Sequence, residues 1–159
     1  MSDILYMVLP CYNEEEVLHE TTKRLKEKLE YLIKKDIISK NSKVMYVNDG
    51  SKDNSYKVMC ELAQKDANIK CINLSRNFGS HAAILCGLTK CTGDCAVVKA
   101  ADLQEPTELI LDMVTSWKKG NNVVLAVREG RKEALSQKVF AKMYYGLVRK
   151  TALPSMPKG

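Results

Sequence analysis

The sequence predicts an α/β protein with a mostly parallel sheet and helices on both of its faces. Segments with the apolar character of strands alternate with segments of helical period along most of the chain, and this alternation is typical of parallel sheets. The chain has 159 residues, 45% hydrophobic and 28% charged, which suits one soluble domain with a real core. No stretch approaches the roughly 18 consecutive apolar residues of a membrane span.

Each strand is expected to lead into a helix. The first helix has the clearest pattern, because Leu18, Leu25, Leu29 and Leu32 recur at helical spacing and would share one face. The expected strand-then-helix units are residues 4–9 with 16–34, 43–47 with 54–66, 69–74 with 80–90, 95–99 with 106–118, and 122–127 with 134–150.

Six cysteines are spread along the chain without any C-x-x-C pair. Most fall in apolar segments, where free cysteine behaves as a small buried hydrophobe. We therefore expect free thiols and a reducing, cytosolic environment. The first ten residues include Asp3 and lack a basic start, so no signal peptide is expected.

The net charge of +6 is unevenly distributed. Residues 1–116 sum to −2 and residues 117–159 sum to +8, which directs the basic end toward an anionic partner. Nucleic acid is disfavoured because this segment lacks interleaved aromatic residues and repeated basic stripes. The phosphates of a small ligand, or an anionic membrane surface, fit at least as well.

Every chemically unusual stretch follows an expected strand. In a parallel sheet such stretches emerge at one edge, where open α/β sheets hold their ligands. The sequence therefore predicts a site there, built from residues 10–16, 48–54, 75–81, 101–106 and 128–132.

The first stretch contains no glycine, so it is not a Gly-rich phosphate-binding loop. Tyr12 is a candidate for stacking on a flat ring, and Glu14 for accepting hydrogen bonds from ribose hydroxyls. The alternative is a helix N-terminus at which acidic residues are favoured by the helix dipole. That alternative accounts for Glu15 and Glu16 but not for Tyr12.

The second stretch combines turn and cap residues with one carboxylate left over. Asp53 or Asn54 is expected to cap the next helix, and Gly50 permits a tight turn. Asp49 remains, at the end of a strand, where a carboxylate can bind a base edge or a hydroxyl.

In the third stretch, Arg76 is a candidate for a bidentate phosphate contact. Gly79 permits close approach of a ligand to the backbone. His81 is a possible base, but a place in the first turn of a helix is the simpler interpretation.

The fourth stretch ends an apolar run in Asp102, followed by Gln104 and Pro106. Proline suits the first turn of a helix, and carboxylate and amide oxygens suit a divalent cation that carries phosphates. A helix cap is the alternative for Asp102, but it would lie four residues early. In the fifth stretch, Arg128, Arg131 and Lys132 either form a solvated charge run or neutralise a diphosphate.

Four of these stretches resemble, in order and in spacing, the family 2 glycosyltransferases, and among them the polyprenyl-phosphate sugar transferases that use bactoprenol or dolichol phosphate. The resemblance covers residues 4 to about 131. The matching motifs are residues 10–15 (PCYNEE), 47–53 (VNDGSKD), 75–79 (SRNFG) and 101–106 (ADLQEP).

The resemblance implies a GT-A (Rossmann-like) fold over residues 1–150 and a glycosyltransferase that uses a UDP-sugar or GDP-mannose with Mg²⁺ or Mn²⁺. It also implies a polyprenyl-phosphate or other cell-envelope glycan acceptor. Asp102 and Gln104 would approach the metal and the diphosphate, and Arg128 or Arg131 would meet phosphate and act in catalysis with Asp102. The residues expected to bind the nucleotide sugar are Pro10, Tyr12, Asn13, Glu14, Asp49, Arg76, Gly79 and Asp102.

Because a phosphate acceptor is already anionic, direct displacement with inversion of the anomeric carbon is expected, without an obligatory strong base. The alternatives are a donor-binding fragment without turnover and a nucleotidyltransferase. The latter is disfavoured because it generally needs a glycine-rich, basic first loop, unlike residues 10–16.

The sequence departs from the family pattern in two ways. Many members carry an Asp-x-Asp motif, but Ala100 occupies its first position and leaves Asp102 alone. We also expect residues 151–159 to be a tail that leads toward an acceptor segment and membrane helices. The basic, amphipathic residues 138–150 either lie on the cytoplasmic face of the membrane in the intact protein or pack on the sheet.

Overall fold

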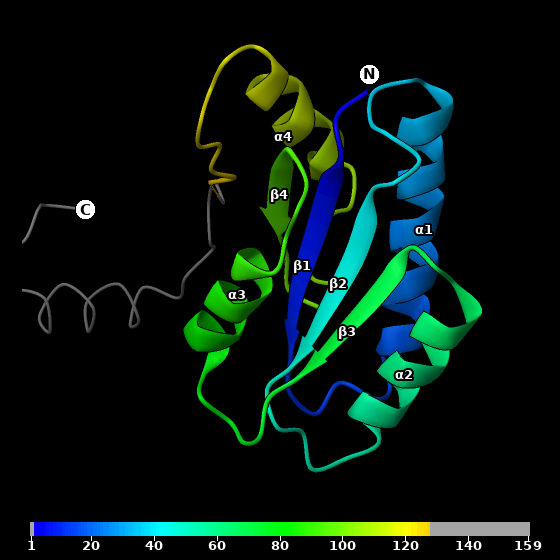
Figure 1. The fold of residues 1–159 in the computed structure, drawn as a ribbon, viewed down its shortest axis with the longest axis vertical. Helices are drawn as coiled ribbons and strands as arrows, with labels where there is room; N and C mark the ends of the chain where they lie inside the picture. Colours follow the sequence, from blue (N-terminus) through cyan, green and yellow to red (C-terminus); the bar gives the residue numbers. More distant parts are fainter. Residues whose placement is uncertain (1, 128–159) are drawn as a thin grey trace, which may run out of the picture. The chain divides into compact units, whose positions relative to one another are not determined.

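A four-stranded parallel sheet in the order β3-β2-β1-β4 organises the protein (Figure 1). The structure is a computed structural model that describes residues 2–127. The chain divides into two compact units after Leu125, and the sheet belongs to the first. The elements are β1 (Leu5–Cys11), α1 (Leu18–Lys34), β2 (Lys43–Asn48), α2 (Ser55–Lys65), β3 (Ile69–Asn73), α3 (Ser80–Thr89), β4 (Cys95–Val98) and α4 (Leu109–Lys118).

Strand β1 lies at the centre of the sheet and pairs in parallel with β2 and β4. Its register runs from Tyr6 opposite Lys43 to Cys11 opposite Asn48. Because β3 is also parallel to β2, all four carboxyl ends lie at the same edge of the sheet. The loops that follow the strands are thereby brought to one end of the molecule.

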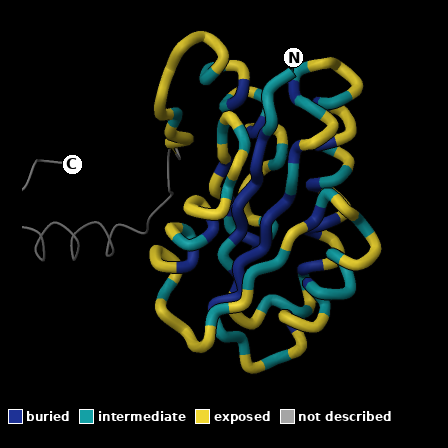
Figure 2. Tube along the Cα trace, in the orientation of Figure 1, coloured by how far each residue is buried: buried dark blue, intermediate teal, exposed yellow. Residues whose placement is uncertain are grey.

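Helices cover both faces of the sheet, as the sequence predicts. One face packs against α1, α2 and α4 in the larger core cluster, and the other packs against α3. Gly87 lets α3 approach closely, since a Cβ there would lie 2.5 Å from Cγ1 of Val8. Figure 2 shows β1 and β2 as the most continuously buried part of the sheet.

Helix α1 buries the predicted leucine stripe. Leu18, Leu25, Leu29 and Leu32 all belong to the larger core cluster. Burial of each side chain stabilises the fold by roughly 2 kcal/mol. The opposite face carries the charged residues, which is why this long segment forms a surface helix rather than a buried one.

Strand β1 and helix α4 differ most from their predicted limits. Strand β1 continues through Pro10 and Cys11, so Pro10 lies in the sheet rather than in the loop. Helix α4 begins at Leu109 instead of Pro106. The reason is that the Lys99 side chain binds the carbonyl of Glu105, which ties the chain back to β4 just before Pro106.

The predicted strand at residues 122–127 is wrong. In the described chain these residues form no strand, and Val123 and Leu125 are 77% and 79% exposed. An apolar run becomes a strand only when a neighbour completes its hydrogen bonds, and among the described residues β4 pairs only with β1. The predicted helix at 134–150, the loop at 128–132 and the tail at 151–159 lie outside the described residues.

All six cysteines are free, as predicted. Burial raises the pKa of Cys71 to about 12 and that of Cys95 to about 11. These thiols therefore stay protonated at neutral pH and serve as small apolar side chains. Within residues 2–127, no helix is both long and apolar enough to cross a membrane.

Candidate functional site

Four loops meet at the carboxyl edge of the sheet (Figure 1). We call them loop 1 (residues 12–17), loop 2 (49–54), loop 3 (74–79) and loop 4 (99–108). Their convergence was predicted from the parallel direction of the strands, and it is confirmed for these four. The predicted fifth loop, with Arg128 and Arg131, lies outside the described residues.

Loops 1 and 2 are joined by hydrogen bonds between backbone and side chains. The Asn13 amide donates to Ser51 Oγ at 3.0 Å, and Asn13 Oδ1 accepts from the Lys52 amide at 2.8 Å. The Glu14 amide donates to Ser55 Oγ at 2.7 Å. Asn13, which was predicted to bind the donor, thus uses its side chain to hold loop 2 in place.

A second set of bonds crosses between the same loops. The Asn54 amide donates to Glu15 Oε2 at 2.8 Å, and the Glu15 amide donates to Asp53 Oδ2 at 3.2 Å. Asp53 Oδ1 also accepts from the Ser55 amide at 3.0 Å. Burial acts to raise the pKa of Asp53, but its hydrogen bonds from Ser55 and Glu15 lower it overall. Asn54 occupies the N-cap position of α2 but makes no side-chain cap bond. Asp53, one residue earlier, accepts the amide of the first helical residue, and Glu15 has a structural role.

Asp49 joins loop 2 to loop 3. Asp49 is only 3% exposed. Its two carboxylate oxygens accept hydrogen bonds from the amides of Phe78 at 2.7 Å and Gly79 at 2.9 Å. Gly50 adopts φ +68°, and a Cβ there would lie 2.6 Å from the Asn77 nitrogen. Asp49, which was predicted to bind the nucleoside, organises loop 3 in this structure.

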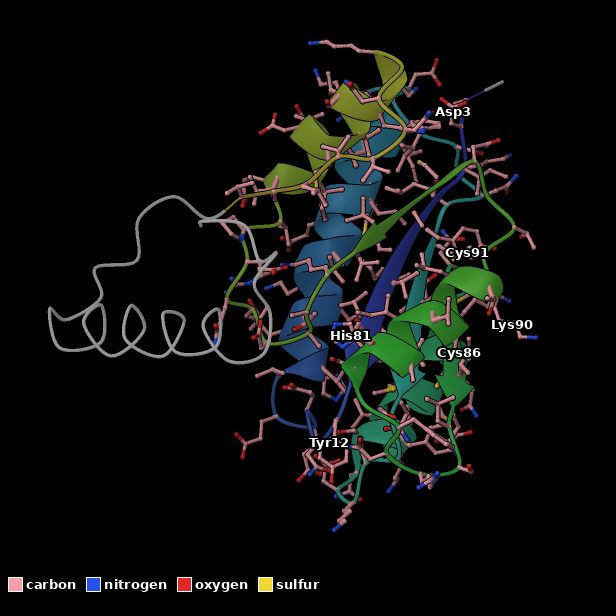
Figure 3. All side chains as sticks on the ribbon, turned by 90° about the vertical axis from the view of Figure 1, so that its left-hand side faces the viewer. Asp3, Tyr12, His81, Cys86, Lys90 and Cys91 are labelled. Atoms are coloured by element: carbon pink, nitrogen blue, oxygen red, sulfur yellow. The ribbon has the colours of Figure 1, made fainter. Side chains whose placement is uncertain are left out.

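Loop 3 presents an aromatic ring and a cation to solvent. Phe78 is 50% exposed, and the Arg76 guanidinium lies 4.5 Å from the centre of its ring. Gly79 adopts φ +93° with nothing within 4 Å of the position that a Cβ would take, so a ligand has room to approach the backbone. Figure 3 shows His81 in the first turn of α3, the position that the simpler interpretation predicted.

Loop 1 supplies the exposed face of the site. Tyr12 is 38% exposed and lies at the sheet edge where the loops meet (Figure 3). Burial raises the pKa of Glu14, and the charges of Asp102 and Asp53 raise it further. The charge of Asp102 in loop 4 therefore acts on Glu14 in loop 1, as a smaller cause than burial.

In loop 4, Asp102 is half-buried and its Oδ1 accepts from the Gln104 amide at 3.1 Å. Leu103 between them adopts φ +61°, a left-handed conformation that L-residues rarely adopt. Helix α4 begins at Leu109, so Asp102 does not cap it. The cap interpretation of Asp102 is therefore wrong.

The metal-binding capacity of this edge is limited. In residues 2–127, no three histidine, cysteine or carboxylate side chains are grouped so that they could hold a metal ion. Asp102 Oδ2 has no protein partner in the described part of the chain, and Gln104 is exposed. These two side chains fit a cation whose remaining ligands come from water or from the phosphates of a bound molecule.

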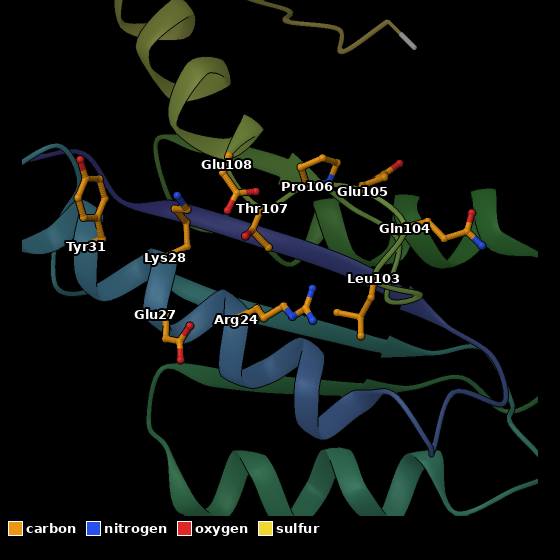
Figure 4. A pocket seen from close by; sticks show the side chains of 10 residues that line it. All are labelled: Arg24, Glu27, Lys28, Tyr31, Leu103, Gln104, Glu105, Pro106, Thr107 and Glu108. Atoms are coloured by element: carbon orange, nitrogen blue, oxygen red, sulfur yellow. The ribbon is translucent and has the colours of Figure 1, made fainter. Parts of the chain in front are cut away.

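A groove of about 660 Å³ separates loop 4 from helix α1 (Figure 4). The groove borders loop 4 along residues 103–108, whereas Tyr12, Glu14 and Asp102 do not line it. Figure 4 shows the Gln104 side chain directed away from α1. The residues that line the groove are Arg24, Glu27, Lys28, Tyr31, Leu103, Gln104, Glu105, Pro106, Thr107 and Glu108.

The sequence-based prediction missed several residues that shape the site. Ser51 and Ser55 accept hydrogen bonds from backbone amides of loop 1. Thr21 and Lys99 donate hydrogen bonds to backbone carbonyl groups of loop 4. Only Lys99 gave a signal in the sequence, since it interrupts the apolar run that precedes Asp102. A lysine there is either exposed or paired, and the structure shows that it is paired.

The comparison with known protein families decides the identity of this fold. The model of the family described as "Glycosyl transferase family 2" matches residues 6–156, nearly the whole chain. The chain belongs to glycosyl transferase family 2. The four predicted motifs lie within this match, and in the structure they form the four loops at the sheet edge.

Two curated relatives of this family 2 glycosyltransferase chain are described as uncharacterized glycosyltransferases. The chain is 46% identical over 143 residues to glycosyltransferase YkcC of Bacillus subtilis (strain 168), with 89% of this chain and 42% of that protein covered. It is 38% identical over 145 residues to sll0501 of Synechocystis sp. (strain ATCC 27184 / PCC 6803 / Kazusa), with 91% and 44% covered. The chain therefore spans less than half the length of these relatives.

Solved structures share the fold. S. aureus TarS 1–349 in complex with UDP aligns with a TM-score of 0.59 at 18% identity, over 82% of this chain and 40% of that one. Mannosyltransferase PcManGT from Pyrobaculum calidifontis, in complex with GDP-Man and Mn²⁺, aligns with a TM-score of 0.58 at 19% identity, over 70% and 31%. At such identities the likeness shows the fold alone, and it confirms the predicted GT-A-like α/β architecture.

Proposed function

We propose that the protein containing this chain transfers a sugar from a nucleotide diphosphate sugar to a polyprenyl phosphate or another cell-envelope glycan acceptor. The observation that carries the proposal is that the loops bearing Tyr12, Glu14 and Asp102 follow two adjacent parallel strands and so leave the same edge of the sheet. An exposed ring, a carboxylate and a second carboxylate beside an amide suit a base, a ribose and a metal-bound diphosphate, respectively.

The donor would lie across loops 1 to 3. Tyr12 would stack on the base and Glu14 would accept from ribose hydroxyls, with Pro10 and Asn13 shaping that side of the pocket. Solved relatives of the same fold hold UDP and GDP-Man, which supports a nucleotide sugar of either base.

On the opposite side, Arg76 would leave Phe78 to pair with phosphate, and Gly79 would admit the diphosphate to the backbone. Asp49 would support this phosphate contact without touching the donor, because it accepts the amides of Phe78 and Gly79 in loop 3. This assignment changes the expected role of Asp49 from a direct contact with the nucleoside to support of loop 3.

Asp102 and Gln104 would hold Mg²⁺ or Mn²⁺ together with the donor phosphates. When bound, such an ion neutralises charge on the departing nucleoside diphosphate. Ala100 supplies no oxygen to the metal, so the donor itself would provide a larger share of the ligands. Donor and metal are therefore expected to bind together rather than independently.

The chemical step would be a direct displacement. A phosphate oxygen of the acceptor forms a bond to the anomeric carbon as the bond from that carbon to the diphosphate oxygen breaks. The attacking oxygen is already anionic, so the chain's task is to align the two groups and to stabilise the leaving group. Arg128 or Arg131 would add positive charge there, and the anomeric configuration would invert. A retained configuration in the product of the intact enzyme would contradict this step.

The proposed lipid acceptor and the cytoplasmic face of the membrane are suggested by residues 138–150, whose sequence mixes basic and apolar side chains. Such a segment suits an anionic lipid surface. Co-sedimentation of the chain with anionic vesicles, weakened by salt, would support this part. Equal binding to neutral vesicles would contradict it.

Calorimetric titration tests the donor site. UDP-glucose, UDP-GlcNAc and GDP-mannose are titrated into the folded chain with and without Mn²⁺, and one of them is expected to bind only when Mn²⁺ is present. Asp102→Ala should lower that affinity at least roughly tenfold, the loss typical of a charged ligand contact. The matched control is Asp112→Ala, an exposed carboxylate on α4, which should leave binding unchanged. Unchanged binding in Asp102→Ala would sink the assignment.

A further inference from the structure

Lys99, the residue that follows β4, is a buried cation beside the site. Its side chain is only 4% exposed. Its Nζ donates to the carbonyl of Glu105 at 2.5 Å and lies 3.7 Å from Glu105 Oε2. A buried ammonium group is costly unless it is paired and hydrogen-bonded. The pairing with Glu105 therefore explains how the fold tolerates a lysine here, but not why a lysine is present.

The place of Lys99 in the sheet sets the direction of its side chain. The Lys99 amide donates to the carbonyl of Val8 at 3.0 Å, which extends the β4 ladder by one residue. Side chains alternate along a strand, so Lys99 lies on the same face as Val97, which belongs to the core cluster of α1 and α4. The ammonium group thus reaches Glu105 from beneath loop 4.

A second tether holds the other side of the loop. Thr21 of α1, itself buried, donates from Oγ1 to the carbonyl of Ala101 at 2.7 Å. The two tethered carbonyl groups, of Ala101 and Glu105, flank the segment from Asp102 to Gln104. Between them Leu103 keeps its left-handed conformation, which persists only when the surroundings impose it.

Packing against α1 gives the outer part of loop 4 little support. The groove of about 660 Å³ lies between this segment and the α1 side chains of Arg24, Lys28 and Tyr31 (Figure 4). The position of the loop therefore depends on its hydrogen bonds rather than on close contact with the helix. Of the two tethers, the one from Lys99 is charge-assisted and hence the stronger.

We propose that Lys99 is a positioning residue, whose buried ammonium group ties the Glu105 carbonyl to the end of β4 and so fixes the position of Asp102 and Gln104 in loop 4. The inference rests on the proposed function for its consequence in metal and donor binding. The position of Asp102 matters more here than in members with an Asp-x-Asp pair, because Ala100 leaves Asp102 as the only carboxylate at the two Asp positions of that pair.

Hydrogen–deuterium exchange of four variants tests the tether without any ligand. Lys99→Met removes the ammonium group, Lys99→Arg restores a charged donor, and Glu105→Gln removes only the charge pair. Lys43→Met is the matched control, because Lys43 also binds a backbone carbonyl, that of Ala67 at 3.1 Å, but at the opposite end of the sheet. The peptide spanning residues 100–108 should exchange roughly tenfold faster in Lys99→Met, less so in Lys99→Arg, and at near-normal rates in Glu105→Gln and Lys43→Met.

Two outcomes of the exchange experiment would overturn the proposal. One is an unchanged rate for residues 100–108 in Lys99→Met. The other is faster exchange throughout β1 and β2, which would assign Lys99 to global stability instead of loop position. Partial recovery in Lys99→Arg and near-normal rates in Glu105→Gln would support a tether that acts through the carbonyl group.

Calorimetry with Mn²⁺ and the donor found for the wild-type chain then tests the consequence. Lys99→Met should weaken binding about tenfold and Lys99→Arg should recover part of that affinity. Faster exchange in loop 4 with unchanged affinity would overturn the positioning role. If the wild-type chain binds no nucleotide sugar at all, the proposed function fails, whereas the exchange experiment still decides whether Lys99 holds the loop.

Discussion

Loops 1 to 3 and loop 4 end at the same edge of the sheet, but different interactions hold them there. Loops 1 to 3 are cross-linked to one another, with Asn13, Glu15, Asp49 and Asp53 binding backbone amides of a neighbouring loop. Loop 4 has no such bond to loops 1 to 3 in the described structure and is tethered from below by Thr21 and Lys99.

This difference separates the two tasks of the proposed nucleotide-sugar site. The surface proposed for the nucleoside is preorganised, since its loops form one hydrogen-bonded unit before any ligand binds. The segment proposed for the metal and diphosphate depends on two tethers beside an open groove. Substitutions in the first region should therefore lower the stability of the whole fold, and substitutions in the second should change loop 4 locally.

The largest effect is expected from Gly50→Ala, which tests how closely loops 2 and 3 pack. A Cβ at this position would lie 2.6 Å from the Asn77 nitrogen, and φ is +68°. The neighbouring atoms belong to the backbone and cannot move without disturbing both loops. We expect the free energy of unfolding, measured by urea denaturation, to fall by roughly 3 kcal/mol or more.

Gly120→Ala is the control for the strain of a positive φ alone. Gly120 adopts φ +97° with nothing within 4 Å of an added Cβ. Its substitution should cost only about 1–2 kcal/mol. Equal losses in the two variants would show that loops 2 and 3 do not resist a methyl group, and the contrast between the two regions would be lost.

Asp49→Asn is expected to have the next largest effect. The asparagine keeps one acceptor oxygen but turns an NH₂ group toward the amide of Phe78 or Gly79, where the carboxylate now accepts. Loss of a buried, charge-assisted bond should lower the free energy of unfolding by about 2–3 kcal/mol. The amides of Phe78 and Gly79 should also exchange faster in an NMR measurement.

Asp94→Asn provides the comparison for Asp49. Asp94 also accepts a backbone amide, that of Ile4 at 2.7 Å, but in an exposed setting at the other end of the sheet. We expect a loss below about 1 kcal/mol. If Asp49→Asn costs no more than Asp94→Asn, Asp49 does not hold loop 3.

A smaller and more local effect is expected from Thr21→Val, which removes one tether of loop 4. Loss of the bond to the Ala101 carbonyl should lower the free energy of unfolding by about 1–2 kcal/mol and speed hydrogen exchange in residues 100–108. Thr22→Val is matched, because Thr22 is buried on the same helix but bonds to Leu18 and Tyr46. Faster exchange of loop 4 in both variants would contradict a specific tether.

The sequence predicted most of this fold because its signals are local. The leucines of α1 and the alternation of strands and helices are visible over a few residues, and parallel order places the loops at one edge. The apolar run at residues 122–127 has the same local appearance as β4. It forms no strand in the described chain, because strand formation also depends on a partner that local pattern does not reveal.

The roles of individual site residues were harder to predict because they depend on contacts between distant segments. Asp49 looked like a free carboxylate, but the amides that it binds lie 29 and 30 residues further along the chain. The role of Lys99 was not predicted, because only the folded structure shows that its Nζ donates to the Glu105 carbonyl of loop 4. Tyr12 remained exposed, as a side chain with no structural partner would.

The smallest effect is expected from Glu14→Gln, which tests the influence of the Asp102 charge in loop 4 on Glu14 in loop 1. Burial raises the pKa of Glu14, and repulsion from Asp102 and then from Asp53 adds to the shift. Removing the charge should stabilise the fold at pH 7 by no more than about 0.5 kcal/mol, because solvent screens a partly exposed group. Glu16→Gln, an exposed change of the same charge in the same loop, is the control.

The pH dependence of Glu14→Gln distinguishes a local effect at Glu14, from burial and from nearby carboxylates, from a general effect of net charge. With its pKa raised, Glu14 binds a proton more tightly in the folded than in the unfolded chain, so its contribution favours folding at acidic pH and is lost as pH rises through the raised pKa. The stability gain of Glu14→Gln over wild type should therefore be absent at pH values below the ordinary pKa of 4.5 and appear above it. Urea denaturation from pH 3 to 8 measures the difference. A gain that does not change with pH, or an equal gain in Glu16→Gln, would mean that neither burial nor Asp102 raises the pKa of Glu14 in the folded chain.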